Sequence, residues 1–413
     1  MAHAVAMRIS SAALLERLCG LLLWLTGFSS AFVLMEPSPY EVVALATMAL
    51  FFLTGLPLRA GQLPLLLLLV VYGIGLTIGT VPVLGRDHTV LWTLVSWFMV
   101  ATAFFFACVL AEDTGRRLNL LLAGYMAAAV FIAILAILAY FQLIPGAEEL
   151  LRYGRAKGTF KDPNVLGPFL VLPALLCIRR VFSGGLWNFL VGGSTLALFA
   201  VALLLTFSRG AWAHFAFSAV LYVIFLFAIS DNARERGRIV LASVVAALVI
   251  GAAIAAIVST QSVGELFTER ASLGQSYDVG HLGRFGRHIL GAALALDNPF
   301  GIGPLQFVRY FPEDAHNVYL NSFMAGGWIA GISYLLLVAL TLFVGFKAVK
   351  IHTPWRPVML AVFATFIGVM IEGAIIDTDH WRHFWLLLGT LWGGAIAAQR
   401  YTMSAARRAR AMA

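Results

Sequence analysis

The run "LPLLLLLVVYGIGLTIGTV" (63–81) decides the fold class, because it holds no charged residue and is long enough to cross a membrane as a helix. A spanning helix needs about 20 predominantly apolar residues. The whole chain shares this character: of its 413 residues, 61% are hydrophobic and only 12% are charged. Soluble domains carry about 25% charged residues. The sequence therefore predicts an all-α polytopic integral membrane protein.

The same length rule predicts about twelve transmembrane helices in a single transmembrane domain, 1–413. Two of the connections between them are long: a loop at 144–162, and a loop at 259–316 that carries an amphipathic helix. The expected spans are 12–34, 41–57, 63–81, 90–110, 118–143, 163–179, 187–206, 210–229, 239–258, 317–346, 357–376 and 383–400.

The lysines and arginines set the expected orientation. With twelve spans and both termini on one side, most of the 28 basic residues fall on that side, and most of the 20 acidic residues fall on the other. Basic residues favour the cytoplasmic side, so we expect cytoplasmic termini and both long loops outside. The basic tail "RRARAMA" (407–413) is typical of an anchor at anionic membrane lipids, and we expect no nucleic-acid partner.

Metal and cofactor chemistry has no recognisable signature in the sequence. Cys19, Cys108 and Cys177 all lie inside apolar runs and form no C-x-x-C pair. The chain has no H-E-x-x-H motif and no acidic cluster with ligand spacing. We therefore expect neither a metal nor a cofactor.

Arginines on the outer side are the informative ones, because the charge rule does not require them there. Arginine grips phosphate oxygens in a fork and stays charged, so several arginines converging from separate loops suit a diphosphate or another polyanion. The alternative for each one alone is a snorkelling anchor or a surface ion pair. The main candidates are Arg152, Arg155, Arg209, Arg284 and Arg287.

Arg209 stands out within "LLLTFSRGAW" (203–212), in a short turn between two spans. Ser208 is placed to cap the helix that follows, so a helix N-terminus and a guanidinium would form an anion site together. "KDPN" (161–164) repeats the arrangement, with Asp162 as the N-cap and Pro163 at the first helical position. Asn164 is a further candidate there, although a well-capped helix without other function explains this motif equally well.

A helix is expected at 282–296 in the longest loop. Arg284, Arg287, His288 and Gly291 recur at helical spacing on one face, with apolar residues mostly opposite. This pattern is typical of a helix that lies on or near the bilayer with its cationic face free.

His316 closes the loop, just before the span that starts at Asn317. The positive end of that helix should keep the imidazole neutral, and a neutral imidazole beside arginines can act as a general base. Taken alone, a loop histidine is more often structural. Asn317 is expected to cap the helix or to orient a neighbouring group.

Two further polar features, an outer turn and an acid within a span, can be explained by the membrane interface alone. "DTDHWRH" (377–383) is an outer turn between the last two spans, which would suit a metal or a sugar but is more typical of a polar interfacial turn with a tryptophan anchor. Glu372 lies inside a span near its outer end. Intramembrane acids are often functional, but this one can also reach the interface.

Four segments taken together resemble the bacterial O-antigen ligase superfamily, which includes O-antigen ligases and O-antigen or exopolysaccharide polymerases. In chain order they are "RAKGTFKDPNVLGPFL", "LLTFSRGAW", "GRFGRHILGAALALDNPFGIGPLQF" and "AHNVYLNSFMAGG". Each is loose alone, but their order makes the resemblance specific. One departure is His288, where the family often has tryptophan.

The resemblance implies an inverting, metal-independent glycosyltransferase that acts at the periplasmic face of the bacterial inner membrane. The donor would be a glycan on undecaprenyl diphosphate. Arg209 and Arg284 match the arginines expected to hold the diphosphate, and His316 matches the residue proposed to deprotonate the acceptor hydroxyl. Arg152, Arg155, Arg287, Asn164 and Asn317 are further candidates for contacts.

The acceptor separates the functions that remain open. O-antigen ligation, with lipid A–core as acceptor, is the first interpretation. Polymerisation onto a second lipid-linked glycan is the alternative within the family. A transporter or flippase of lipid-linked sugars is the alternative from another class, but the basic cluster lies on one face and no span has a lysine or arginine at its middle. A purely structural membrane protein would not need Arg209, Arg284 and His316 together.

Overall fold

The computed structural model describes residues 2–86, 88–259, 264–265, 267, 280 and 282–412. Part of the predicted loop 259–316 lies outside the described residues. The described chain is mainly helical. Its one sheet in these ranges is the hairpin of β1 (Leu151–Arg152) and β2 (Arg155–Ala156).

The predicted all-α class is confirmed, and each predicted span overlaps a helix. Eight helical stretches in the described ranges are long and apolar enough to cross a membrane. The count of twelve stays a prediction. The helices are α1 (Ala2–Ser29), α2 (Pro39–Leu53), α3 (Leu63–Thr80), α4 (Thr89–Val109), α5 (Thr114–Tyr140), α6 (Pro163–Phe169), α7 (Val171–Phe182), α8 (Leu186–Leu204), α9 (Arg209–Ile229), α10 (Ala233–Val258), α12 (Arg284–Asp297), α13 (Val318–Lys350), α14 (Arg356–Glu372) and α15 (Arg382–Met412).

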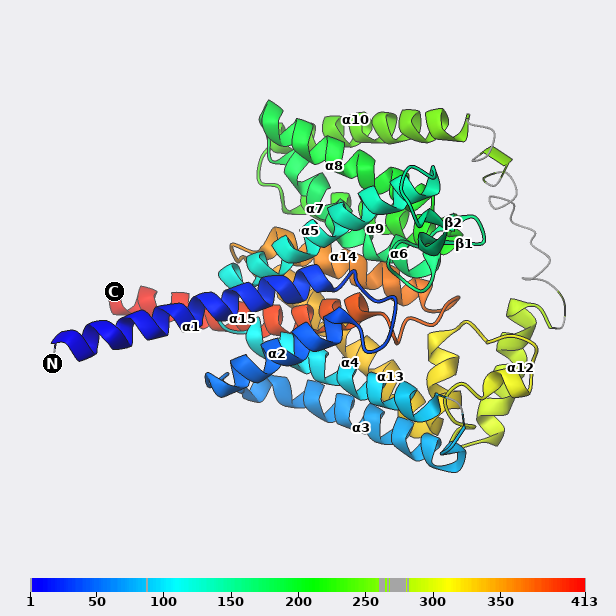
Figure 1. The fold of residues 1–413 in the computed structure, drawn as a ribbon. Helices are drawn as coiled ribbons and strands as arrows, with labels where there is room; N and C mark the ends of the chain where they lie inside the picture. Colours follow the sequence, from blue (N-terminus) through cyan, green and yellow to red (C-terminus); the bar gives the residue numbers. More distant parts are fainter. Residues whose placement is uncertain are drawn as a thin grey trace.

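The helices form one bundle with two distinct ends. The start of α1 and the end of α15 lie together at one end, while α12, β1 and β2 lie at the other (Figure 1). We call the second the His316 end, because α13 begins there directly after His316. The helices α6 and α9 also begin at this end, so their positive N-termini gather at the same place.

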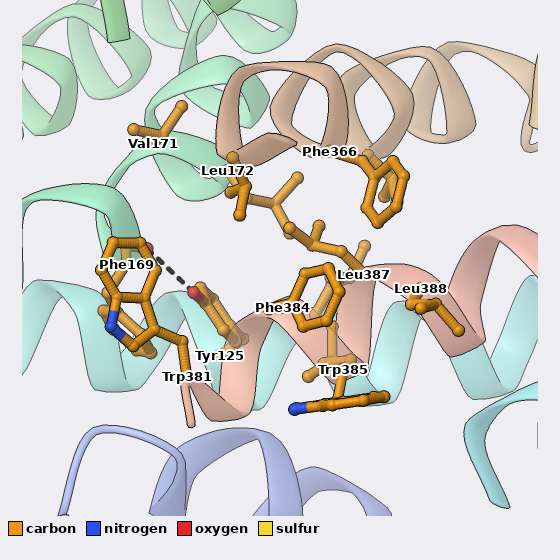
Figure 2. Packing of buried hydrophobic residues seen from close by; sticks show 14 of the residues in the cluster. Tyr125, Phe169, Val171, Leu172, Phe366, Trp381, Phe384, Trp385, Leu387 and Leu388 are labelled. Atoms are coloured by element: carbon orange, nitrogen blue, oxygen red, sulfur yellow. Dashed lines mark hydrogen bonds between the residues drawn. The ribbon is translucent and has the colours of Figure 1, made fainter. Parts of the chain in front are cut away.

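The centre of the bundle is formed around α15. Every residue from 381 to 398 is buried. Trp385 and Phe384 pack among side chains of α5, α7 and α14 (Figure 2). The last predicted span is therefore enclosed by other helices.

The predicted span 163–179 is divided into α6 and α7 at Leu170. Pro173 has no N–H, so it cannot donate to the carbonyl of Phe169, four residues earlier. The Tyr125 hydroxyl from α5 donates to that carbonyl instead, at 2.9 Å (Figure 2). A side chain thus satisfies the backbone group that proline leaves open.

A break in α13 attaches the long loop to the bundle. Gly326 and Gly327 leave the helical conformation, and Gly327 has φ 67°, a region that glycine occupies without strain. The segment after α12 crosses this break: Ile302 N donates to Met324 O at 2.8 Å, and Trp328 N donates to Pro299 O at 2.9 Å. A Cβ on Gly327 would lie 2.3 Å from Pro299 O, so the close approach requires glycine.

Candidate functional site at the His316 end

His316 is fixed against the end of α14. The next residue, Asn317, caps α13 as predicted: its Oδ1 accepts from Leu320 N at 3.1 Å. Its Nδ2 donates to Ala374 O at 3.0 Å, and Val318 N donates to Gly373 O at 2.9 Å. Two hydrogen bonds therefore tie the start of α13 to the residues that follow α14.

Asp377 is the partner of His316, and it was not among the residues predicted from the sequence. Its Oδ2 lies 3.8 Å from His316 Nδ1, in the turn between α14 and α15. The polar turn "DTDHWRH" was the only sequence feature that pointed to this position, and its composition is more typical of an interfacial anchor. The pairing depends on how three helix ends meet, which spacing along the chain does not reveal.

Asp377 changes the expected electrostatics of His316. Its carboxylate is the main cause that raises the pKa of His316, with Asp314 contributing, while burial and Arg284 lower it. The helix dipole was expected to act in the opposite direction, to disfavour the charged ring. His316 is instead a stronger base than an ordinary histidine. Desolvation raises the pKa of Asp377 to about 6, and the carboxylates of Asp314 and Asp379 add to this effect.

The predicted loop helix is confirmed as α12, but its orientation differs from the expectation. Its polar face is not free: Arg287 is 3% exposed, and His288 Nε2 donates to Ala315 O at 2.9 Å. Phe285 and Ile289 on the other side are 56% and 75% exposed. Because polar groups find partners only in the protein or in water, α12 directs them at the His316 loop and leaves its apolar side outward.

Within α12, Arg284 and Arg287 have different surroundings. Arg287 Nη1 donates to Leu282 O at 3.0 Å, and Nη2 pairs with Glu313 at 2.9 Å. These contacts give Arg287 a structural role in holding the loop. Arg284 begins α12 and is partly exposed, and it lies near enough to His316 to lower its pKa. His288, the departure from the family pattern, fastens α12 to the residue before His316.

A second group of candidates surrounds the starts of α6 and α9. The predicted caps are confirmed: Ser208 Oγ accepts from Ala211 N at 3.3 Å, and Asp162 Oδ1 accepts from Asn164 N at 2.8 Å. Arg155 joins the two starts, because Nε donates to Thr206 O at 2.7 Å and Nη2 donates to Asn164 Oδ1 at 2.8 Å.

Arg209 and Arg152 complete this second group. Arg209 is the first residue of α9 and is partly exposed. Arg152 pairs with Asp162 at 3.0 Å, on an exposed surface. An exposed ion pair of this kind contributes little to stability.

The end of α14 connects the two groups. Glu372 does not extend to the membrane interface. It is buried, at 4% exposed, and its Oε2 lies 2.9 Å from His214 Nδ1 of α9. His214 Nε2 donates to Thr365 O at 3.1 Å, so one proton shared between Nδ1 and the carboxyl satisfies both groups. Helix α9, with Arg209 at its start, is thereby fixed to the helix whose end supports Asn317.

The described residues contain no group of three or more His, Cys, Asp or Glu side chains placed to hold a metal ion. What they bring together at one end of the bundle is a histidine–aspartate pair, an arginine beside it, and capped helix N-termini with a second arginine nearby. This arrangement suits removal of a proton close to a bound polyanion.

The comparisons with known proteins bear on this site. A family model described as O-antigen ligase matches residues 194–335, a segment that includes Arg209, Arg284 and His316. No curated protein matches the chain. The match supports a membrane glycosyltransferase of the O-antigen ligase or polymerase type. It confirms the resemblance to the O-antigen ligase superfamily over this segment, which holds three of the four motifs.

Proposed function

We propose that this protein transfers a glycan from undecaprenyl diphosphate to an acceptor hydroxyl at the periplasmic face of the bacterial inner membrane, with both termini in the cytoplasm. The transfer inverts the configuration at the anomeric carbon and needs no metal ion. The first candidate for this transfer is O-antigen ligation to lipid A–core. The observation that carries this proposal is His316, 3.8 Å from Asp377 and within electrostatic reach of Arg284.

His316 supplies the base. Its Nδ1 faces Asp377, which leaves Nε2 to accept the proton of the acceptor hydroxyl. As the proton moves, the hydroxyl oxygen forms a bond to the anomeric carbon, and the bond from that carbon to the diphosphate oxygen breaks. A single displacement of this kind inverts the configuration.

Arginines and helix ends stabilise the leaving group. A departing diphosphate needs no proton, because cations can balance the charge that develops on it. Arg209 and Arg284 each begin a helix at the His316 end, where the positive end of the dipole adds to the guanidinium. Arg155 and Asn164 link the starts of α6 and α9, Asn317 caps α13, and Arg152 and Arg287 support the neighbouring loops.

The test is a lipopolysaccharide gel from a deletion strain that carries wild type, His316→Ala or Asp377→Asn, with undecaprenyl-linked glycans analysed alongside. Loss of the ladder with accumulation of long lipid-linked glycan supports ligation. Loss of long chains with single-unit products remaining supports polymerisation. An unchanged gel with loss of secreted polysaccharide moves the acceptor away from lipid A–core.

A second experiment separates transfer from transport. The purified protein in detergent, with no gradient across a membrane, is given an undecaprenyl-diphosphate glycan and an acceptor. We expect formation of the transferred product by wild type and its loss in His316→Ala. A transporter would form no product, and full activity of His316→Ala would refute the role of the histidine.

A further inference from the structure

A cavity of about 620 Å³ is lined by Asp377, the partner of His316. It is lined by loop residues and by the first turns of α4, α6, α13 and α15. Small-ligand sites typically have about 300–1,000 Å³. The donor chemistry described above uses arginines outside this cavity, so its occupant must be sought among other molecules.

The two cations on the described cavity wall are already neutralised by carboxylates. Lys161 Nζ pairs with Glu36 Oε1 at 2.9 Å. Arg382 Nη2 pairs with the same oxygen of Glu36 at 3.1 Å and with Glu41 Oε1 at 2.8 Å. The charge of each cation on this wall is therefore balanced by a carboxylate.

Three aspartates on the wall lack a lysine or arginine partner among the described residues. Asp377 faces His316 at 3.8 Å, and Asp379 Oδ2 faces His380 Nδ1 at 3.4 Å. Asp314 Oδ1 accepts from Ala315 N at 2.8 Å. Their mutual repulsion contributes to the raised pKa of Asp377. The cavity therefore presents negative charge, which repels an anionic ligand.

Aromatic rings and a buried imidazole complete the wall. Trp92 is partly exposed, and its ring lies 4.4 Å from that of His380. Trp381 stacks on His383 at 5.2 Å. His383 is 3% exposed, and its Nε2 has no hydrogen-bond partner among the described residues. Carboxylates accept hydrogen bonds from hydroxyls, and an aromatic face packs against the apolar face of a pyranose ring.

We propose that this cavity binds the acceptor sugar whose hydroxyl reaches His316, and that it selects a sugar bearing no phosphate or carboxylate group. This inference rests on the proposed function. An anion site at the arginines and a hydroxyl site at the aspartates would then both serve His316, and their difference in charge would direct each substrate to its own site.

The experiment uses protein in lipid nanodiscs, an undecaprenyl-diphosphate glycan as donor, and two acceptors that differ in one group: an alkyl glucoside and the corresponding alkyl glucuronide. We expect wild type to use the glucoside with a kcat/KM at least about tenfold higher, because the carboxylate of the glucuronide meets the three aspartates. Asp379→Asn should reduce this preference at least threefold by removing one charge at constant shape.

Trp92→Leu tests the aromatic wall. It should raise the KM of the glucoside about tenfold without changing the KM of the donor. Trp97→Leu is the matched control, because Trp97 lies on the same helix, donates to Thr77 Oγ1 at 2.9 Å, and does not line the cavity. It should leave both KM values unchanged.

Binding without transfer distinguishes the two proposals. Titration of each glycoside into protein lacking donor compares the two affinities directly, and a thermal shift with undecaprenyl diphosphate reports the donor site. Equal affinity for the two glycosides, or a change of donor KM in Trp92→Leu and Asp379→Asn, overturns the cavity assignment. Absence of undecaprenyl diphosphate binding speaks against the proposed function and leaves the comparison of glycosides valid.

Discussion

The site around His316 has two sides: a cationic side, where Arg209 and Arg284 begin helices, and an acidic side, where aspartates line a cavity. Arg284 lowers the pKa of the histidine from the first side, and Asp377 raises it from the second. The two sides differ in charge although both lie at the same end of one bundle. This difference in charge indicates how one base can serve both a charged donor and an uncharged acceptor while each substrate binds at its own site.

The largest effect is expected at the histidine between the two sides. General base catalysis contributes about 10²–10⁴-fold, so His316→Ala should reduce the rate of glycan transfer by that factor. Binding of undecaprenyl diphosphate should be nearly unchanged, because the arginines remain. Initial rates and a binding titration measure the two quantities. His352→Ala is the control, because His352 is exposed between α13 and α14, and a comparable loss there would contradict a specific role for His316.

The next largest effect is expected on the cationic side. Removing one preorganised charge from a site of this kind costs about 10²–10³-fold in kcat. We expect this loss for Arg209→Ala and Arg284→Ala, together with weaker binding of undecaprenyl diphosphate. Lysine keeps the charge but not the fork, so Arg284→Lys should recover only part of the rate. Arg309→Ala, an exposed arginine of the same loop, should have no effect.

A smaller effect with a defined pH signature is expected for Asp377→Asn. His316 acts as a base only when neutral, so activity falls as the pH drops through its pKa, which lies above the ordinary value. Removing Asp377 removes the main cause of the increase, while burial and Arg284 still lower the pKa. The acidic limb of the pH–rate profile should therefore move to lower pH, and the plateau rate should fall about tenfold.

The control for this prediction is Asp297→Asn at the exposed end of α12, which should leave the profile unchanged. A shift of the acidic limb to higher pH would contradict the pairing of Asp377 with His316. An unchanged limb with a lower rate would give Asp377 a structural role only.

Features set by neighbouring residues were predictable from the sequence. The caps at Asp162, Ser208 and Asn317 are confirmed, because each depends on a side chain and backbone groups within three residues. The amphipathic helix α12 is confirmed for the same reason. The spans overlap the helices because apolar length dominates their stability in a membrane.

Features set by the meeting of distant segments were not predictable. Asp377 lies about sixty residues from His316 along the chain, and only the contact of α13 with the end of α14 brings them together. The outward apolar face of α12 reverses the usual expectation, because the polar groups of the His316 loop are the better partners for its arginine and histidine. The break in α13 at Gly327 was not predictable either, because it accommodates a segment from another part of the chain that crosses it.

The smallest effect distinguishes residues that hold the cationic side in place from residues that would contact the donor. Glu313 is 58% exposed and pairs with Arg287, whose side chain is 4% exposed. An exposed carboxylate in such a pair contributes little, so Glu313→Gln should change the transfer rate by no more than about twofold. Arg287→Met should instead lower the thermal stability of the purified protein, because it removes the donor to Leu282 O that fastens the first turn of α12.

For Arg287→Met the rate per folded molecule should fall far less than for Arg284→Ala, one turn earlier on the same helix. Rates normalised to folded protein and melting curves in detergent measure both variants under the same conditions. If Arg287→Met lost as much rate as Arg284→Ala at unchanged stability, Arg287 would belong to the anion site, and the cationic side would extend deeper under α12 than its contacts with Glu313 and Leu282 indicate.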